Sequence, residues 1–204
     1  MLDRLNSALS AARAALDRTL DDKGLMADAA KAATLLSQTI NSGGKILICG
    51  NGGSSCDAAH FAEELTGRFR ADRRPLAAIA CTDIGHITCT ANDYGFDHIF
   101  SRWVEALGKR GDTLIVLSTS GNSANCLRAL EAADELGMNT IAMLGKGGGK
   151  MLKRATIQLV VPGGTSDRIQ ELHMLLLHTF VECIEAGLNA GHSAVQSDGH
   201  HHGR

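Results

Sequence analysis

Five short, almost continuously apolar runs separated by longer helix-like segments most limit how this chain can fold. Strands that are apolar along their whole length are typical of parallel sheets, because helices cover both faces of such a sheet. We therefore predict an α/β fold with a doubly wound, five-stranded parallel sheet of the flavodoxin-like type. The predicted strands are 45–49, 76–80, 113–117, 140–144 and 157–161.

Helical segments fill the intervals between these runs. The predicted helices that alternate with the strands are 55–68, 84–91, 97–107, 123–136 and 166–190. Two further helical stretches, 2–20 and 25–41, precede the first strand; both are rich in Ala and Leu, with apolar residues at helical spacing. They are too apolar on one face to stand alone, so we expect them to pack against other subunits.

These patterns divide the chain into three parts. Residues 1–42 form an N-terminal helical extension for oligomerisation, and residues 43–190 form the α/β domain. Residues 191–204 are small, polar and His-rich, and we expect them to be disordered. Within the α/β domain, we interpret the Gly147-Gly148-Gly149 run as a flexible turn after the fourth strand.

The charge balance and the cysteines bear on partners and location. Lys plus Arg is 20 and Asp plus Glu is 22, so the net charge of -2 gives no reason to expect nucleic acid or an anionic membrane as a partner. We see no signal-peptide pattern and no membrane-spanning run, so we expect a cytoplasmic protein. The six cysteines form no Cys-x-x-Cys pair. We interpret them as small buried residues in a reducing compartment, with a zinc–thiolate site as the less favoured alternative.

A hydroxyl-rich turn, Ser118-Thr119-Ser120-Gly121-Asn122-Ser123, follows the third predicted strand and opens a helix. A helix N-terminus offers unpaired backbone N–H groups and a partial positive charge, so hydroxyls at that point suit a phosphate group. No Gly-Lys-Ser/Thr follows, so the turn is not a Walker loop. We interpret it as a site for one phosphate monoester, such as a sugar phosphate. The alternative is a Ser/Thr N-cap without a ligand.

A second loop, Gly50-Asn51-Gly52-Gly53-Ser54, follows the first predicted strand. Ligands of parallel sheets bind at the carboxyl ends of the strands, where this loop and the hydroxyl-rich turn both lie. Its glycines allow a ligand to approach closely, although a tight turn alone explains them equally well. Asn92-Asp93 is either a turn or a recognition point for sugar hydroxyls. Arg68 ends a helix, where a cation is favoured; a phosphate or subunit contact is the alternative.

His60 and Glu64 lie four residues apart on the helix after the first strand, so their side chains share one face. This spacing suits two ligands of one metal ion or an acid–base pair. From these two residues alone, a polar pair on a solvated face is the favoured interpretation. Asp57, one turn earlier, either orients His60 or is an acid favoured at the start of a helix.

The last long helix carries Gln170, His173 and His178. His178 follows three leucines, which indicates either a core histidine or a functional one; without other information the core interpretation is favoured. Gln170 and His178 are about 12 Å apart along an ideal helix, so one metal ion contacts both only if the side chains lean together. We interpret His173 as structural.

Together these motifs resemble the phosphoheptose isomerase family of the sugar isomerase (SIS) domain superfamily, in order from about residue 40 to 188. The motifs that carry the resemblance are Gly50-Asn51-Gly52-Gly53-Ser54, His60-Phe61-Ala62-Glu63-Glu64-Leu65, Asn92-Asp93, Ser118-Thr119-Ser120-Gly121-Asn122-Ser123 and Asp167-Arg168-Ile169-Gln170-Glu171-x-His173.

The resemblance implies conversion of sedoheptulose 7-phosphate to D-glycero-D-manno-heptose 7-phosphate, the first step toward ADP- or GDP-activated heptose. It implies a homotetramer with active sites at subunit interfaces, and zinc held by His60, Glu64, Gln170 and His178. Glu64 is expected to take a proton from carbon, and His178 to act as an acid on the opposite side. The implied substrate-binding residues are Asn51, Gly52, Gly53, Ser54, Arg68, Asn92, Asp93, Ser118, Thr119, Ser120, Ser123, Asp167 and Gln170.

Other functions remain as alternatives. A relative with the same fold is not an enzyme and binds the bacterial replication initiator protein, but it lacks the counterparts of Glu64 and His178. A sugar-phosphate-sensing module normally accompanies a DNA-binding domain, and no helix-turn-helix segment is apparent here. Isomerases of the same superfamily that act on hexose or pentose phosphates are a further alternative.

Overall fold

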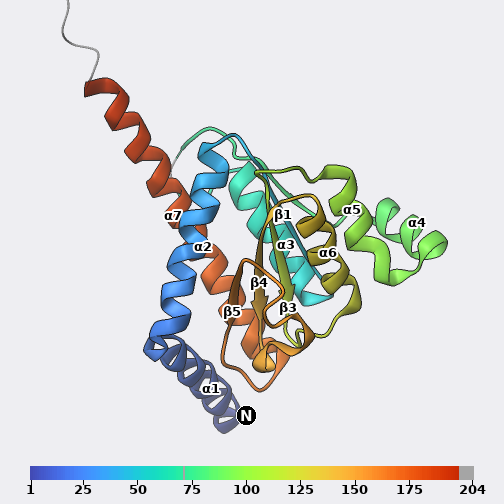
Figure 1. Cartoon of the computed structure of the whole chain (residues 1–204). Coiled ribbons are helices and arrows are strands. Elements are labelled where there is room, and N and C mark those ends of the chain that lie inside the picture. The colour runs from blue at the N-terminus through green and yellow to red at the C-terminus, as the bar shows by residue number, and fades with distance from the viewer. Residues whose placement is uncertain (71, 198–204) are drawn as a thin grey trace, which may run out of the picture.

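A parallel sheet with the strand order β2-β1-β3-β4-β5 lies at the centre of the computed structural model (Figure 1). All neighbouring strands run parallel, which confirms the predicted doubly wound, flavodoxin-like sheet. The structure describes residues 1–70 and 72–197, with side chains as far as residue 188. The strands are β1 (Ile46–Gly50), β2 (Ala78–Ala80), β3 (Thr113–Ser118), β4 (Asn139–Leu144) and β5 (Ile157–Val160).

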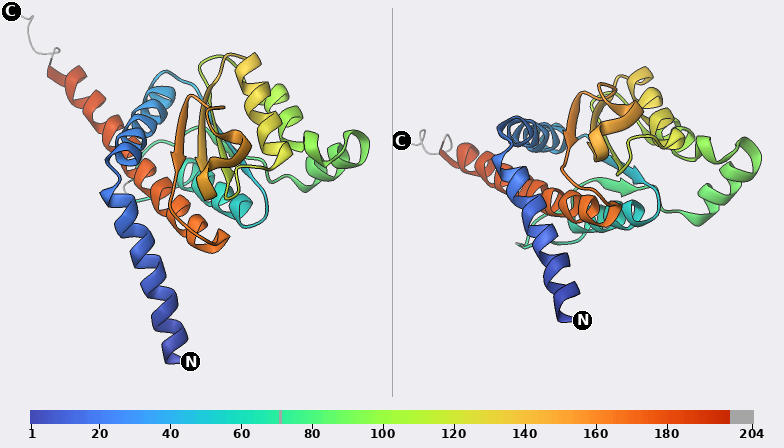
Figure 2. Two further views of the ribbon diagram at one scale, coloured as in Figure 1. Left: turned by 60° about the horizontal axis from the view of Figure 1, so that its bottom comes forward. Right: turned by 90° about the horizontal axis from the view of Figure 1, so that it is seen from below.

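Helices cover both faces of the sheet (Figure 2). Successive residues of a strand point to opposite faces, and the hydrophobic core is divided accordingly. Ile46 and Ile48 of β1 pack with α2, α3 and α7, whereas Leu47 and Cys49 pack with α5 and α6. The helices are α1 (Leu2–Asp21), α2 (Lys23–Asn41), α3 (Gly53–Thr66), α4 (Ile84–Tyr94), α5 (Ile99–Leu107), α6 (Ala124–Glu135) and α7 (Ser166–Ser197), with short 3-10 segments η1 (Phe96–His98) and η2 (Lys146–Met151).

The strand order creates a crevice at the carboxyl edge of the sheet. β1 pairs with β2 on one side and with β3 on the other. The connections that leave β1 and β3 therefore cross to opposite faces of the sheet, which is the point where open α/β folds bind ligands. Both loops singled out in the sequence, 50–54 and 118–123, begin at this crevice.

The two N-terminal helices differ in how they are packed. Helix α2 buries Ala32, Leu36 and Ile40 in the same cluster as α3 and α7. Helix α1 extends away from the sheet (Figure 2) and buries only Ala15 and Thr19. Its exposed leucines recur at helical spacing and form one stripe, which we name the α1 leucine stripe: Leu2, Leu5, Leu9 and Leu20.

Two helices end later than predicted. Helix α4 runs to Tyr94, so Asn92 and Asp93 lie in its last turn rather than in a loop; Gly95, with φ 89, ends it. Asn and Asp carry only a modest penalty inside a helix, so the turn prediction was wrong there. Helix α7 is described as far as Ser197, past the predicted boundary at residue 190. Residues 198–204 of the predicted disordered tail lie outside the described residues.

The cysteines divide by position. Cys49, Cys81 and Cys126 are buried, and burial raises the pKa of each thiol, to about 12 for Cys81 and Cys126. The other three, Cys56, Cys89 and Cys183, are exposed, so the prediction that all six are buried was wrong. They occupy solvent-facing positions of α3, α4 and α7, where neighbouring apolar residues in the sequence turn to other faces. Among the described residues, no helix is both long and apolar enough to cross a membrane.

Candidate active site

Three possible metal ligands from two helices lie together. The His60 Nε2 and Glu64 Oε1 atoms of α3 are 3.0 Å apart, and His178 Nε2 of α7 lies 3.9 Å from the same Glu64 oxygen. One ligand atom from each residue lies within 4.8 Å of the others. We name these residues the α3–α7 cluster. The second Glu64 oxygen, Oε2, is buried and has no hydrogen-bond partner among the described residues.

His178 is a member of this cluster and not a core histidine. Its side chain is 33% exposed, and its ring meets the His60 ring edge-on with centroids 5.0 Å apart. The Phe69 ring stacks on the His178 ring, with the two centroids 5.9 Å apart. The core interpretation of His178 is therefore wrong. His60 and Glu64 do form the polar pair on one helix face, with side chains 46% and 13% exposed, and the packing of α7 against α3 adds His178 to it.

A cavity of about 220 Å³ lies at the crevice where the two loops meet. It confirms that the glycine loop, the hydroxyl-rich turn and Gln170 face one space. Ser123 is the N-cap residue of α6, yet its side chain accepts no capping hydrogen bond from the helix. The interpretation as an N-cap without a ligand is therefore not supported. The cavity is lined by Asn51, Ser54, Leu117, Ser118, Thr119, Ser120, Ser123, Ser166 and Gln170.

Gln170 links the cavity to the helix of the metal-ligand candidates. Its amide nitrogen donates to Ser54 Oγ at 3.3 Å. A Cβ atom on Gly53 would lie 2.7 Å from that nitrogen, so a larger residue at this position would displace the Gln170 amide from Ser54. Gln170 and His178 lie two turns apart on α7.

The glycine-rich segment after β4 supports the hydroxyl-rich turn. The Lys150 N–H donates to Asn122 Oδ1 at 3.1 Å, and the Met151 N–H donates to the Gly121 carbonyl at 3.0 Å. Gly147, Gly148 and Gly149 have positive, non-helical φ angles within η2, so a turn is present there as predicted, and it packs against the hydroxyl-rich turn. At Gly149, with φ 53, a Cβ atom would lie 2.6 Å from the Ser120 carbonyl oxygen, so a side chain there would block this close backbone contact.

Comparison with known proteins assigns the chain to a family. The family model of the SIS domain matches residues 9–145. The phosphoheptose isomerase of Enterobacter sp. (strain 638) is 50% identical over 184 residues, which are 90% of this chain and 96% of that protein. The chain belongs to the phosphoheptose isomerase family. Members of this family are sugar-phosphate isomerases, so the chain is an enzyme of that class.

Solved structures of phosphoheptose isomerases share the fold. The enzyme from Neisseria gonorrhoeae superposes with a TM-score of 0.85 at 42% identity, over 91% of this chain and 98% of that chain. The enzyme from Francisella tularensis gives a TM-score of 0.85 at 40% identity, over 90% and 97% of the two chains. The SIS fold predicted from the resemblance is thus confirmed.

Six predicted substrate-binding residues of this phosphoheptose isomerase family member do not line the cavity: Gly52 and Gly53 of the glycine loop, and four residues outside that loop. Asn92 and Asp93 are exposed on α4, which projects to one side of the sheet (Figure 1), and Asn92 Nδ2 donates to Asp93 Oδ1 at 2.8 Å. Arg68 is exposed just after α3. Asp167, also exposed, pairs with Arg168 at 3.3 Å, and its hydrogen bond with Thr165 lowers the pKa of its carboxyl. A single chain therefore does not bring these residues to the cavity.

Two titratable groups near the cluster have shifted pKa values. Burial raises the pKa of Asp57, and the nearby His60 partly offsets this shift. Among the described residues, Asp57 Oδ2 has no hydrogen-bond partner, so the role of Asp57 in orienting His60 stays a prediction. Burial lowers the pKa of His173 to about 4, although its hydrogen bond to the Leu144 carbonyl acts in the other direction. His173 is fully buried and neutral, in keeping with the structural interpretation.

The sequence analysis missed several residues of the site. Asn125 exchanges two amide hydrogen bonds with Asn51, at 2.9 and 2.8 Å, and so ties the glycine loop to the start of α6. The Thr119 and Ser166 hydroxyls are 3.1 Å apart. Arg73 donates to the carbonyl of Glu64. The helix start predicted at residue 123 is the only signal that pointed toward Asn125.

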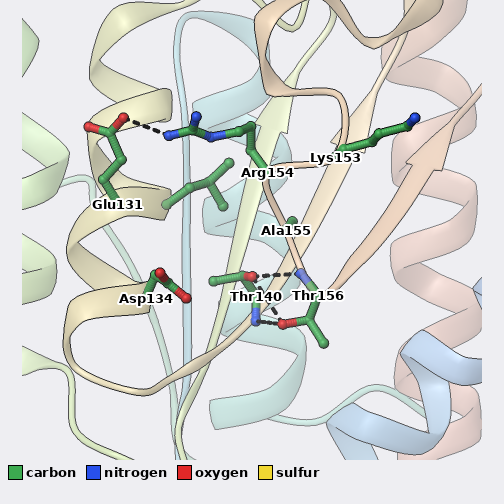
Figure 3. Close-up of a pocket in the computed structure, with 8 residues that line it drawn as sticks. Glu131, Asp134, Thr140, Lys153, Arg154, Ala155 and Thr156 are labelled. Atoms are coloured by element: carbon green, nitrogen blue, oxygen red, sulfur yellow. Dashed lines mark hydrogen bonds and ion pairs between the residues drawn. The ribbon is translucent and has the colours of Figure 1, made fainter.

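Another cavity, of about 510 Å³, lies at the opposite edge of the sheet (Figure 3). Thr140 lies at the amino end of β4, and Thr156 directly precedes β5. The cavity is therefore at the amino edge of the sheet, where open α/β folds do not bind their ligands. Its Glu131 and Arg154 form an ion pair at 3.0 Å. We assign it no part in the reaction.

Proposed function

We propose that this protein converts sedoheptulose 7-phosphate to D-glycero-D-manno-heptose 7-phosphate in the cytoplasm, as the first step toward ADP- or GDP-activated heptose. Its phosphoheptose isomerase relatives support this choice of reaction. The observation that carries the proposal is the α3–α7 cluster on two helices that also line a hydroxyl-rich cavity. Proton-transfer groups and a phosphate anchor are the two parts that such an isomerisation needs.

The hydroxyl-rich turn binds the phosphate in this proposal. Ser118, Thr119, Ser120 and Ser123 donate hydrogen bonds to its oxygens, and the N-terminus of α6 adds backbone N–H groups and a favourable dipole. Asn51, Gly52, Gly53, Ser54 and Gln170 lie along the sugar chain. The reacting end of the sugar then faces the α3–α7 cluster.

Glu64 and His178 move the protons. The reaction removes a proton from C1 of the ketose to form an enediolate and returns a proton to C2, while a proton passes from the C1 hydroxyl to the C2 oxygen. We assign Glu64 to the carbon-bound proton, because its carboxylate is only 13% exposed and its Oε1 lies 3.0 Å from His60 and 3.9 Å from His178. His178 acts as the acid at oxygen from the other side.

We further propose that His60, Glu64, Gln170 and His178 hold a zinc ion. Imidazole nitrogens and a carboxylate are donors that zinc takes, and the unpartnered Oε2 of Glu64 fits a cationic neighbour. When bound, such an ion supplies Lewis-acid polarisation of the sugar oxygens. The chain's own contribution is to hold the ligands on two packed helices.

We also propose a homotetramer with active sites at subunit interfaces. The α1 leucine stripe is a single apolar face that a second copy of the chain would cover. Arg68, Asn92, Asp93 and Asp167 are exposed in one chain, and assembly would bring them to the substrate. Nucleic acid and membrane are not partners in this proposal.

The decisive experiment incubates the purified protein with sedoheptulose 7-phosphate, with and without added zinc, and follows the aldose product. We expect zinc-dependent turnover and a loss of at least about 100-fold in kcat for Glu64→Gln. Glu131→Gln is the matched control with unchanged activity, because Glu131 lies at the opposite edge of the sheet. An absence of turnover with any metal would overturn the proposal and favour the non-catalytic alternative, tested next by binding to the replication initiator protein.

A further inference from the structure

Arg73 caps the helix that carries His60 and Glu64. It lies in the connection between α3 and β2, and its guanidinium reaches back to the last turn of α3. Nη2 donates to the Glu64 carbonyl at 2.7 Å, and Nη1 donates to the Leu65 carbonyl at 3.0 Å. Because α3 ends at Thr66, these carbonyls are among those without an intrahelical partner, and a cation is favoured there.

The same guanidinium also binds the second helix of the α3–α7 cluster. Arg73 Nε donates to Glu185 Oε1 of α7 at 2.8 Å, and the two side chains are only 10% and 12% exposed. Glu185 lies seven residues, or about two turns, after His178. One planar group therefore joins the backbone of Glu64 to the helix that bears His178.

We propose that Arg73 is a positioning residue that presets the distance between Glu64 and His178, with Glu185 as its anchor on α7. This inference rests on the zinc site proposed above. Metal ligands must be placed to within a few tenths of an ångström, and groups that orient ligands typically change metal affinity by about 10- to 100-fold. Lysine does not replace arginine here, because a point charge cannot bond two carbonyls and a carboxylate in one plane.

A neighbouring ion pair provides the matched control. Arg70 and Glu182 also join the segment after α3 to α7, at 2.7 Å, but their side chains are 67% and 42% exposed. No hydrogen bond from Arg70 to an α3 carbonyl is found among the described residues. Exposed pairs of this kind contribute little. Glu182→Gln and Glu185→Gln are thus the same chemical change, one turn apart on one helix, at an exposed and at a buried pair.

The test measures zinc affinity of the full chain by competition with a chromophoric chelator, well below the melting temperature of each variant. We expect Arg73→Lys and Glu185→Gln to weaken zinc binding by about 10- to 100-fold. Glu182→Gln and Arg154→Lys should stay within about twofold of the wild type, as expected for exposed pairs. Far-UV circular dichroism of the metal-free proteins verifies that each variant is folded.

The outcomes separate this inference from the proposal on which it rests. A wild-type protein that binds no zinc overturns the zinc site, and the positioning role falls with it. A wild-type protein that binds zinc, together with folded Arg73→Lys and Glu185→Gln variants of unchanged affinity, overturns the positioning role alone. If Arg73→Lys does not fold, Glu185→Gln decides, because it keeps the arginine and a hydrogen-bond acceptor.

Discussion

A Cβ atom on Gly121 would lie 2.0 Å from the carbonyl oxygen of Gly148. The hydroxyl-rich turn and the segment after β4 thus touch backbone to backbone, and neither can shift without the other. Gly121 also has φ 64, a conformation that costs an alanine about 1 kcal/mol.

Gly121→Ala should therefore disrupt phosphate binding far more than its φ angle alone explains. We expect KM for the sugar phosphate to rise by at least about tenfold, because the turn must move away from Gly148. Gly147→Ala is the control: its φ is 77, but nothing lies within 4 Å of its Cβ position, so it carries only the conformational cost. Equal effects of the two substitutions on KM would show that the backbone contact between Gly121 and Gly148 does not shape the hydroxyl-rich turn.

Phe69 should matter for turnover through its stack on His178. Removal of the ring in Phe69→Ala takes away one of the contacts that orient the imidazole, and an aromatic contact of this kind is worth about 1 kcal/mol. We expect kcat to fall by about three- to tenfold, and Phe69→Tyr to retain wild-type kcat. Steady-state kinetics of both variants at saturating zinc checks this. A Phe69→Ala enzyme with unchanged kcat would contradict the prediction.

Stability should fall in mild acid because of His173. Its folded-state pKa of about 4 is below the ordinary value of 6.5, so the unfolded chain binds a proton first as the pH drops. The stability contributed by the neutral histidine is complete above pH 6.5 and is lost toward pH 4, by on the order of 3 kcal/mol. Urea unfolding of the wild type and of His173→Gln over this range measures the loss. The free energy of unfolding of His173→Gln should depend less on pH than that of the wild type. An equal pH dependence of the two proteins would refute the prediction.

The α1 leucine stripe should hold the subunits together. A double substitution, Leu5→Asp with Leu9→Asp, places two charges on the apolar face, so the assembly should dissociate into smaller species. Light scattering coupled to size exclusion reports the mass, and the wild type should appear as a tetramer. Ser7→Asp, on the opposite side of α1, is the control that leaves the mass unchanged. A monomeric wild type would remove the basis of the prediction.

The sheet was predictable because each strand carries its own signal. Runs such as Leu114–Leu117 are apolar along their length, and this requires burial on both faces whatever the rest of the chain does. Helix ends were less predictable. Asn92 and Asp93 suggest a turn by type, but the cap at Asp83 and the stop at Gly95 decide that α4 includes them.

The candidate site was only half predictable from single residues. Helical spacing places His60 with Glu64, but no local pattern indicates that His178, more than a hundred positions later, packs against them. The family resemblance supplied that link. Arg73 stands among Arg68, Arg70 and Arg74, and nothing in this basic segment marks which arginine turns inward.

Helix α7 fixes the spacing between three residues of the candidate site. At its first turn the Ser166 hydroxyl lies beside Thr119 of the hydroxyl-rich turn, and further along it presents Gln170 and then His178. A helix rises by a constant 1.5 Å per residue, so the spacing between these three residues cannot adjust to the ligand. In the proposed binding mode, a sugar phosphate that must engage both ends at once would be selected by the number of carbons between its phosphate and its carbonyl, and a shorter one would reach only one end at a time.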